Sequence, residues 1–151
     1  MNRKHAHALL VGLLATPLVG CGGPFDARVK GQVSLDGQPL TVGTVTFAPA
    51  SSGPSAFAKI DDSGNYELSV GRQRGLPSGQ YTVTVVAREK TTVQRTDGGP
   101  PPPGKLITPP WYKSTNDSGL SFTVEPGSNS IDLDLNTTPP ANWRGGRPGR
   151  R

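Results

Sequence analysis

The sequence predicts an all-β protein that folds as a seven-stranded sandwich. Apolar residues alternate with polar ones in several short runs, the period of a strand with one buried face and one wet face. Turn residues separate the runs at intervals of roughly 8–14 residues, which is typical of sandwiches and barrels. No window carries the apolar stripe of an amphipathic helix, so no helix longer than a turn is expected.

The seven predicted strands are, in order, 29–35, 44–47, 57–60, 66–70, 81–86, 120–124 and 131–135. In the first, Val, Gly, Val and Leu alternate with Lys, Gln and Ser. The second alternates Val and Phe with Thr, whereas the third has a weaker pattern. The next two set Tyr, Leu and Val against Glu, Ser and Thr. In the last two, Leu, Phe, Val and Ile alternate with Ser, Thr and Asp. A segment near Tyr112 is a candidate eighth strand.

Turn chemistry lies between the predicted strands. The turn segments are Asp36-Gly37, Pro49, Asp62-Ser63-Gly64-Asn65, Pro77-Ser78-Gly79 and Pro126-Gly127-Ser128-Asn129. Glycine and asparagine tolerate positive φ, and proline withholds a ladder donor, so each segment ends a strand. The segment 61–65 shares acidic residues with calcium loops but lacks their ligand spacing and late glutamate. We therefore expect a hairpin turn in which Asp62 accepts local N–H groups.

The N-terminus has the parts of a bacterial lipoprotein signal over residues 1–20. Arg3 and Lys4 precede an apolar segment, 8–19, that ends in a lipobox, Leu18-Val19-Gly20-Cys21. Twelve helical residues span roughly 18 Å, too short to cross a hydrocarbon core of about 30 Å. Cys21, the only cysteine, is the predicted site of lipidation. Two or three acyl chains there would hold the mature chain at a membrane.

Localisation follows from this anchor. The predicted location is the cell envelope, and the glycine after Cys21, in place of an aspartate, favours the outer membrane.

Residues 21–26 would form a tether and 27–136 one sandwich domain. Between Cys21 and Asn136 there are ten basic and eleven acidic residues, so the net charge of residues 21–136 is −1. That balance predicts no binding to nucleic acid.

Two segments do not fit the strand pattern. Residues 91–107 contain four consecutive prolines, 100–103, which favour an extended polyproline conformation and donate no ladder hydrogen bonds. We expect a long exposed loop there. Residues 137–151 are rich in Arg, Gly and Pro and contain no acidic residue, so they predict a disordered basic tail.

A set of segments within 27–136 resembles the carboxypeptidase regulatory-like domain. The opening segments are Lys30-Gly31-Gln32-Val33, Asp36-Gly37-Gln38-Pro39-Leu40 and 43–49, followed by 62–68 and 75–83. The segments Pro110-Trp111-Tyr112, 118–120 and 124–135 resemble the closing strands of small lipoproteins abundant in planctomycetes. The resemblance implies a transthyretin-like, or prealbumin-like, Greek-key sandwich. It implies no activity, because such domains are mostly accessory or adhesive modules.

The chemistry of the sequence argues against an enzyme. Both histidines, His5 and His7, lie in the predicted signal, so the mature chain would have none. This excludes Ser-His and Cys-His catalysis and histidine-bound metals, as well as the histidine-dependent enzymes built on transthyretin-like folds. We expect no catalytic residue, no metal and no cofactor. Asp132 and Asp134 are expected on a solvated strand face.

The candidate partner-binding residues are Trp111, Tyr112, Pro101 and Pro102. Trp111 and Tyr112 could form an exposed stacking platform, or they could instead fill and cover the sandwich edge. The prolines could dock into an aromatic groove or serve as a spacer. The predicted function is a lipid-anchored accessory, binding or structural module of the envelope, with another envelope protein or a glycan as partner. A carbohydrate-binding surface domain is the alternative.

Overall fold

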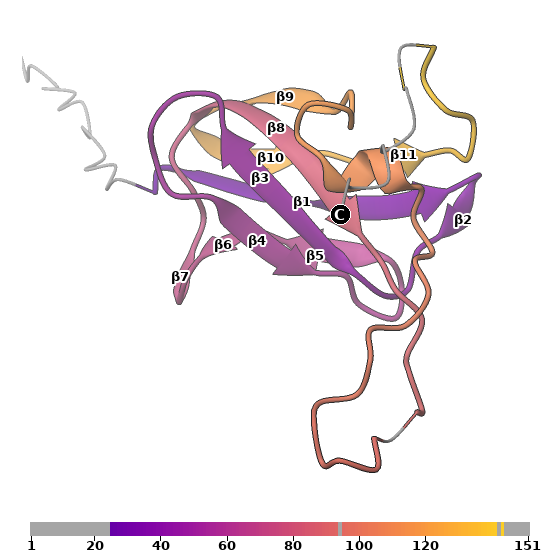
Figure 1. Cartoon of the computed structure of the whole chain (residues 1–151). Helices are drawn as coiled ribbons and strands as arrows, with labels where there is room; N and C mark the ends of the chain where they lie inside the picture. Colours follow the sequence, from indigo (N-terminus) through magenta and orange to yellow (C-terminus); the bar gives the residue numbers. More distant parts are fainter. Residues whose placement is uncertain (1–24, 94, 142, 144–151) are drawn as a thin grey trace, which may run out of the picture.

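The computed structural model describes residues 25–93, 95–141 and 143, which form a β-sandwich (Figure 1). Eleven strand segments in this part of the chain make two sheets, and the one helical element there is a 3-10 turn, η1 (Pro110–Lys113). The all-β sandwich predicted from the sequence is therefore confirmed. Each of the seven predicted runs overlaps at least one of the strand segments.

The smaller sheet is organised around β1 (Ala27–Leu35). On one side β1 pairs antiparallel with β5 (Asn65–Glu67) and β2 (Gln38–Pro39). It also pairs parallel with β10 (Gly127–Ser130) and β11 (Leu133–Leu135). A single long strand thus holds together segments from the beginning, middle and end of the domain.

The larger sheet is antiparallel throughout, with the order β7-β6-β4-β3-β8-β9. Its strands are β3 (Thr44–Pro49), β4 (Ala56–Lys59), β6 (Ser69–Val70), β7 (Gln73–Arg74), β8 (Gly79–Val86) and β9 (Ser121–Val124). The central pair runs in register from Thr44 opposite Val86 to Pro49 opposite Tyr81. β3 and β8 make the longest pairing of this sheet, and each has a further neighbour on its other side.

The core lies between the sheets and consists of the alternating side chains that the sequence predicts to be inward. Phe47 is fully buried at its centre, with ring centroids 6.4 Å from Tyr66, 6.0 Å from Tyr81 and 6.3 Å from Phe122. Val29, which also is fully buried, faces them from β1. Aromatic pairs at such distances contribute beyond their buried area. The pairs with Tyr66 and Tyr81 are tilted and the pair with Phe122 is stacked, and together these rings fill the space between the two sheets.

The predicted strand 66–70 is divided between the two sheets. Tyr66 belongs to β5 in the smaller sheet, whereas Ser69 and Val70 form β6 in the larger one. Leu68 marks the crossing: its N–H donates to the Val29 carbonyl at 3.0 Å, and its own carbonyl accepts from Gly75 N–H at 3.2 Å. Continuous alternation along the run concealed this crossing because both halves face the same core.

The predicted turn 126–129 is shorter than expected, since β10 already begins at Gly127. The Asn129 side chain tightens the turn by accepting from Glu125 N–H at 2.9 Å and donating to the Glu125 carbonyl at 2.7 Å. The backbone of this turn pairs with β1.

The hairpin turn after β4 also differs from the prediction. Asp61, and not Asp62, accepts the local N–H groups, at 2.9 Å from Ser63 and 2.8 Å from Asn65.

The backbone of Ile131 passes very close to Gly31, which is the one position in β1 without a side chain. A Cβ added at Gly31 would lie 1.8 Å from the Ile131 carbonyl oxygen. The ladder breaks here between β10 and β11, and the Asp132 carboxylate accepts the Gln32 N–H at 2.9 Å. Asp132 and Asp134 are exposed, as predicted. Asp132 therefore replaces a missing ladder acceptor.

The predicted tail, 137–151, lies mostly outside the described residues. Its described part contacts the body: Thr137 donates through its N–H and its hydroxyl to the Asp36 carboxylate, at 3.1 Å and 2.9 Å. Trp143 is half-buried against the core. The predicted signal, 1–20, with Cys21 also lies outside the described residues.

Candidate partner-binding loop

The four prolines lie in a long loop that joins β8 to η1 and projects from the sandwich (Figure 1). We call residues 88–107 the proline loop. Its base is a short antiparallel ribbon, in which Arg88 pairs with Leu106 and Glu89 N–H donates to the Lys105 carbonyl at 2.9 Å. The Ile107 N–H donates to the Ala87 carbonyl at 2.8 Å. The loop therefore leaves the sheet as a defined continuation of β8.

Thr108 fixes the root of the loop to the larger sheet. Its side chain is buried, and its hydroxyl donates to the Val85 carbonyl at 3.2 Å while accepting from Ala87 N–H at 3.1 Å. Val85 lies in β8, and Ala87 follows directly after this strand. A buried hydroxyl with a donor and an acceptor satisfied holds two chain segments at a fixed distance. The root of the proline loop is therefore held in place by these hydrogen bonds.

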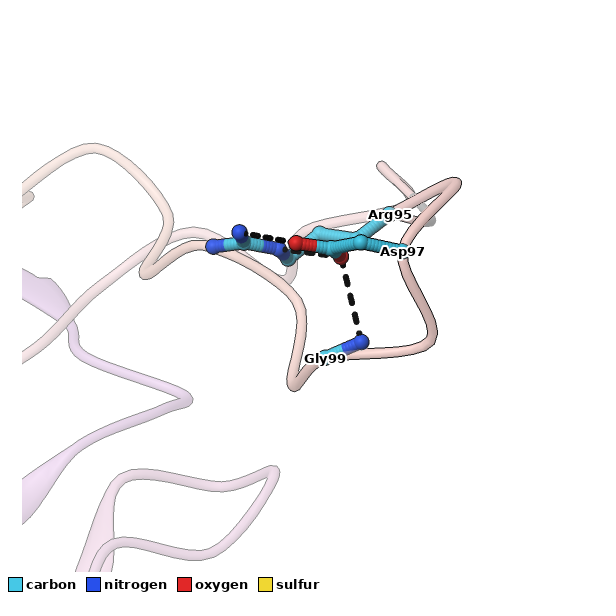
Figure 2. A network of polar contacts seen from close by, with 3 residues as sticks. All are labelled: Arg95, Asp97 and Gly99. Atoms are coloured by element: carbon cyan, nitrogen blue, oxygen red, sulfur yellow. Dashed lines mark hydrogen bonds and ion pairs between the residues drawn. The ribbon is translucent and has the colours of Figure 1, made fainter.

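The tip of the proline loop contains its own local clamp (Figure 2). The Arg95 guanidinium donates to both carboxylate oxygens of Asp97, at 2.8 Å through Nε, and Gly99 N–H donates to the same carboxylate at 3.2 Å. The guanidinium and the Gly99 N–H hold the pKa of Asp97 below its usual value. The clamp holds residues 95–99 in a turn that ends immediately before the first of the four prolines.

Pro101 and Pro102 lie in the exposed run 100–103, in agreement with the predicted exposed loop. The run ends at Gly104, whose carbonyl accepts from the Arg88 guanidinium at 3.0 Å. A Cβ at Gly104 would lie 1.9 Å from the Glu89 carbonyl oxygen, so only glycine fits where the loop returns to its base. The exposed prolines are therefore held between the clamp and the ribbon.

Trp111 and Tyr112 are in a different environment. Both lie on η1, which packs against β8, and only 6% and 5% of their surfaces are exposed. The Tyr112 hydroxyl accepts from Asn136 N–H at 3.1 Å. Trp143 covers Trp111 edge-on, with ring centroids 5.0 Å apart. Of the two sequence alternatives, the structure shows the buried one, and Tyr112 belongs to no strand.

The four predicted partner-binding residues therefore do not form one surface. The prolines are presented to solvent, while the ring face that a sugar would need at Trp111 is covered. Sequence reasoning missed Arg95, Asp97 and Thr108. The spacing Arg95-x-Asp97 followed by two glycines is a turn signal that could have indicated the clamp, whereas nothing local indicates the role of Thr108.

The start of the described chain is fixed at the opposite end of the sandwich. The Asp26 carboxylate accepts from Ser78 N–H at 2.7 Å and from the Ser78 hydroxyl at 2.9 Å, and its carbonyl accepts from Gly127 N–H at 2.9 Å. The hydrogen bonds from Ser78 lower the pKa of Asp26. Ser78 directly precedes β8, while the proline loop follows the other end of the same strand.

An open polar cleft of about 650 Å³ lies beside β1 and β5. Lys30, Lys59 and Glu67 contribute charges to its walls, together with Asp61 and Asp132. The two aspartates already accept backbone N–H groups. Beneath the cleft the Tyr66 hydroxyl donates to the Ile131 carbonyl at 2.6 Å, and burial raises the pKa of Tyr66. Asp61, Asp132 and Tyr66 thus have structural roles in the walls of the cleft.

Within residues 25–93, 95–141 and 143, no group of three or more His, Cys, Asp or Glu side chains could hold a metal ion. In the same residues, no helix has the length and apolar character needed to cross a membrane. No known family model, curated protein or solved structure matches the chain.

Proposed function

We propose that this chain is a lipid-anchored envelope module without catalytic activity, which presents the proline loop to another envelope protein. The lipobox before Cys21 supports the anchor. The observation that carries the binding role is the position of the proline loop. It follows one end of β8, and Asp26 is fixed by Ser78 at the other end.

The distance between these two ends supports the proposal. The eight residues of β8 span about 26 Å at 3.3 Å per residue. Asp26 lies at the start of β8, and the loop extends beyond its end. A sandwich attached through Cys21 would hold its prolines away from the bilayer, where a second protein can reach them.

The chemistry of the loop suggests what it binds. Consecutive prolines adopt an extended helix without internal hydrogen bonds, and this helix docks into grooves lined by aromatic side chains. Its conformation is already set before binding, so little conformational entropy is lost on association. The Arg95–Asp97 clamp and the ribbon at Arg88 limit the motion of the run further. A partner with an aromatic groove fits these properties.

Cross-linking and affinity capture from native cells test the binding role. The full chain is compared with a Pro101→Gly/Pro102→Gly variant, which loosens the polyproline conformation. The matched control is Pro54→Gly, an exposed proline on the loop between β3 and β4. We expect a stoichiometric partner that is retained by the control and lost by the double variant. Equal capture by all three chains would contradict the assignment of the loop.

The anchor is tested separately. Mass spectrometry of the mature N-terminal peptide should find Cys21 with acyl chains, and Cys21→Ser should move the chain from the membrane fraction to the soluble fraction. A wild-type chain recovered without lipid would refute the anchor while leaving the loop assignment open to the capture experiment.

The carbohydrate-binding alternative depends on an exposed aromatic ring. Since Trp111 is covered by Trp143, no observation favours this alternative over protein recognition by the loop.

A further inference from the structure

Two arginines project from the end of the sandwich at which the described chain begins. β6 and β7 form a hairpin whose turn, Gly71-Arg72, precedes Arg74. We call residues 69–76 the arginine hairpin. Arg72 and Arg74 are exposed, and neither forms an ion pair or side-chain hydrogen bond with another described residue. The whole segment from Leu68 to Gly79 contains no acidic residue.

The arginine hairpin is fixed directly beside the start of β1. Ala27 N–H donates to the Leu76 carbonyl at 3.1 Å, and Leu76 N–H donates to the Ala27 carbonyl at 3.0 Å. A Cβ at Gly75 would lie 2.6 Å from the Ala27 carbonyl oxygen, so the two backbones are in close contact. In Figure 1, β7 and the start of β1 lie at the same end of the molecule.

The length of the chain limits how far this end can lie from Cys21. Five peptide units join Cys21 to Asp26, and a fully extended chain of that length reaches about 18 Å at most. This limit holds for any conformation of the intervening residues. If Cys21 carries lipid, Asp26 stays within about 18 Å of the anchor, so the arginine hairpin beside it can reach the headgroups, whereas the proline loop follows the far end of β8.

We propose that the arginine hairpin, with the exposed Arg28 near the start of β1, is a contact surface for the anionic headgroups of the bilayer that holds the anchor. The proposal rests on the proposed function. Basic residues close to an anionic surface each strengthen binding, within a Debye length of about 8 Å at physiological salt. Asp26 and Glu125 are the acidic residues near this end, and Ser78 engages the carboxylate of Asp26. The contact orients the sandwich with its loop outward.

The decisive experiment measures vesicle binding without the lipid. The full chain with Cys21→Ser is mixed with vesicles of phosphatidylglycerol and phosphatidylcholine at low salt. Arg72→Gln/Arg74→Gln should weaken binding about fivefold for each arginine removed. The matched control, Lys59→Gln/Lys113→Gln, removes two positive charges from exposed side chains outside both the arginine hairpin and the proline loop and should leave binding nearly unchanged. Circular dichroism checks that both variants are folded.

Each outcome decides the proposal. Selective weakening by the hairpin variant that disappears in 1 M salt supports it, because the Debye length then falls to about 3 Å. Equal weakening by both variants, or no weakening, overturns it. Vesicles of phosphatidylcholine alone should retain the lipidated wild-type chain. Failure of that retention would refute the anchor and not the hairpin contact, so the two results are distinguishable.

Discussion

At several turns of this protein, polar side chains accept the hydrogen bonds of backbone N–H groups. Asp26, Asp61 and Asn129 each accept one or more backbone N–H groups where a strand begins or ends. Asp132 does the same inside the smaller sheet. An N–H group without an acceptor is costly, so these side chains stabilise chain segments that no ladder supports.

The stabilisation by Asp26 should depend on pH. The Ser78 N–H, followed by the Ser78 hydroxyl, lowers the pKa of Asp26 below its ordinary value of 3.8. A lowered folded pKa gives stability that is present above the unfolded pKa and is lost as pH falls through the folded pKa. Asp26→Asn should therefore be less stable than wild type at about pH 7, and the difference should shrink below about pH 4.

Urea unfolding at about pH 7 and about pH 3 measures this difference. The control is Asp62→Asn, at an exposed position that accepts no hydrogen bond from any described residue. A deficit for Asp26→Asn of equal size at both pH values would show that charge does not contribute.

At the scale of elements, β1 determines how the sandwich is assembled. It pairs with four other segments, and its partners β10 and β11 are separated by the break opposite Gly31. The close approach of Ile131 at that break leaves no room for a side chain on β1. The parallel half of the smaller sheet therefore depends on one glycine.

Gly31→Ala should destabilise the fold by about 3 kcal/mol, because the added methyl group forces Ile131 away from β1. Gly37→Ala is the comparison. Gly37 has a φ of +78° but no atom within contact distance of the added Cβ, so only the backbone strain of about 1 kcal/mol is expected. Chemical denaturation of both variants gives the two values. A smaller loss for Gly31→Ala than for Gly37→Ala would contradict the crowding argument.

At the scale of the whole molecule, the described end of the chain closes the core. Trp143 packs on Trp111, and these are the only two tryptophans of the chain. Trp143→Ala should expose Trp111, increase the quenching of its fluorescence by acrylamide, and lower the unfolding free energy by about 1 kcal/mol. Trp143→Phe retains an aromatic ring there and should preserve most of the protection. Unchanged quenching in the alanine variant would show that Trp143 does not cover Trp111.

The sequence predicted what depends on neighbouring residues and missed what depends on distant ones. The alternation of apolar and polar residues located the strands, because successive side chains of a strand point to opposite faces. The exposed loop at the prolines was predictable because proline has no N–H donor for a ladder. The crossing at Leu68, the parallel pairing of β1 and the bridge at Thr108 depend on contacts far apart in sequence. The burial of Trp111 likewise requires the return of Trp143, which no local pattern indicates.

The pairing of β1 with β10 and β11 joins residues that are 100 positions apart, from Ala27 with Gly127 to Leu35 with Leu135. At a synthesis rate of about 5–20 residues per second, one edge of β1 remains unpaired for roughly 5–20 s, until β10 and β11 have been synthesised. Pairings of such long range also slow folding. The first strand of the domain is thus among the last to be completed. For that time, its open edge is a target for aggregation that a chaperone would have to protect.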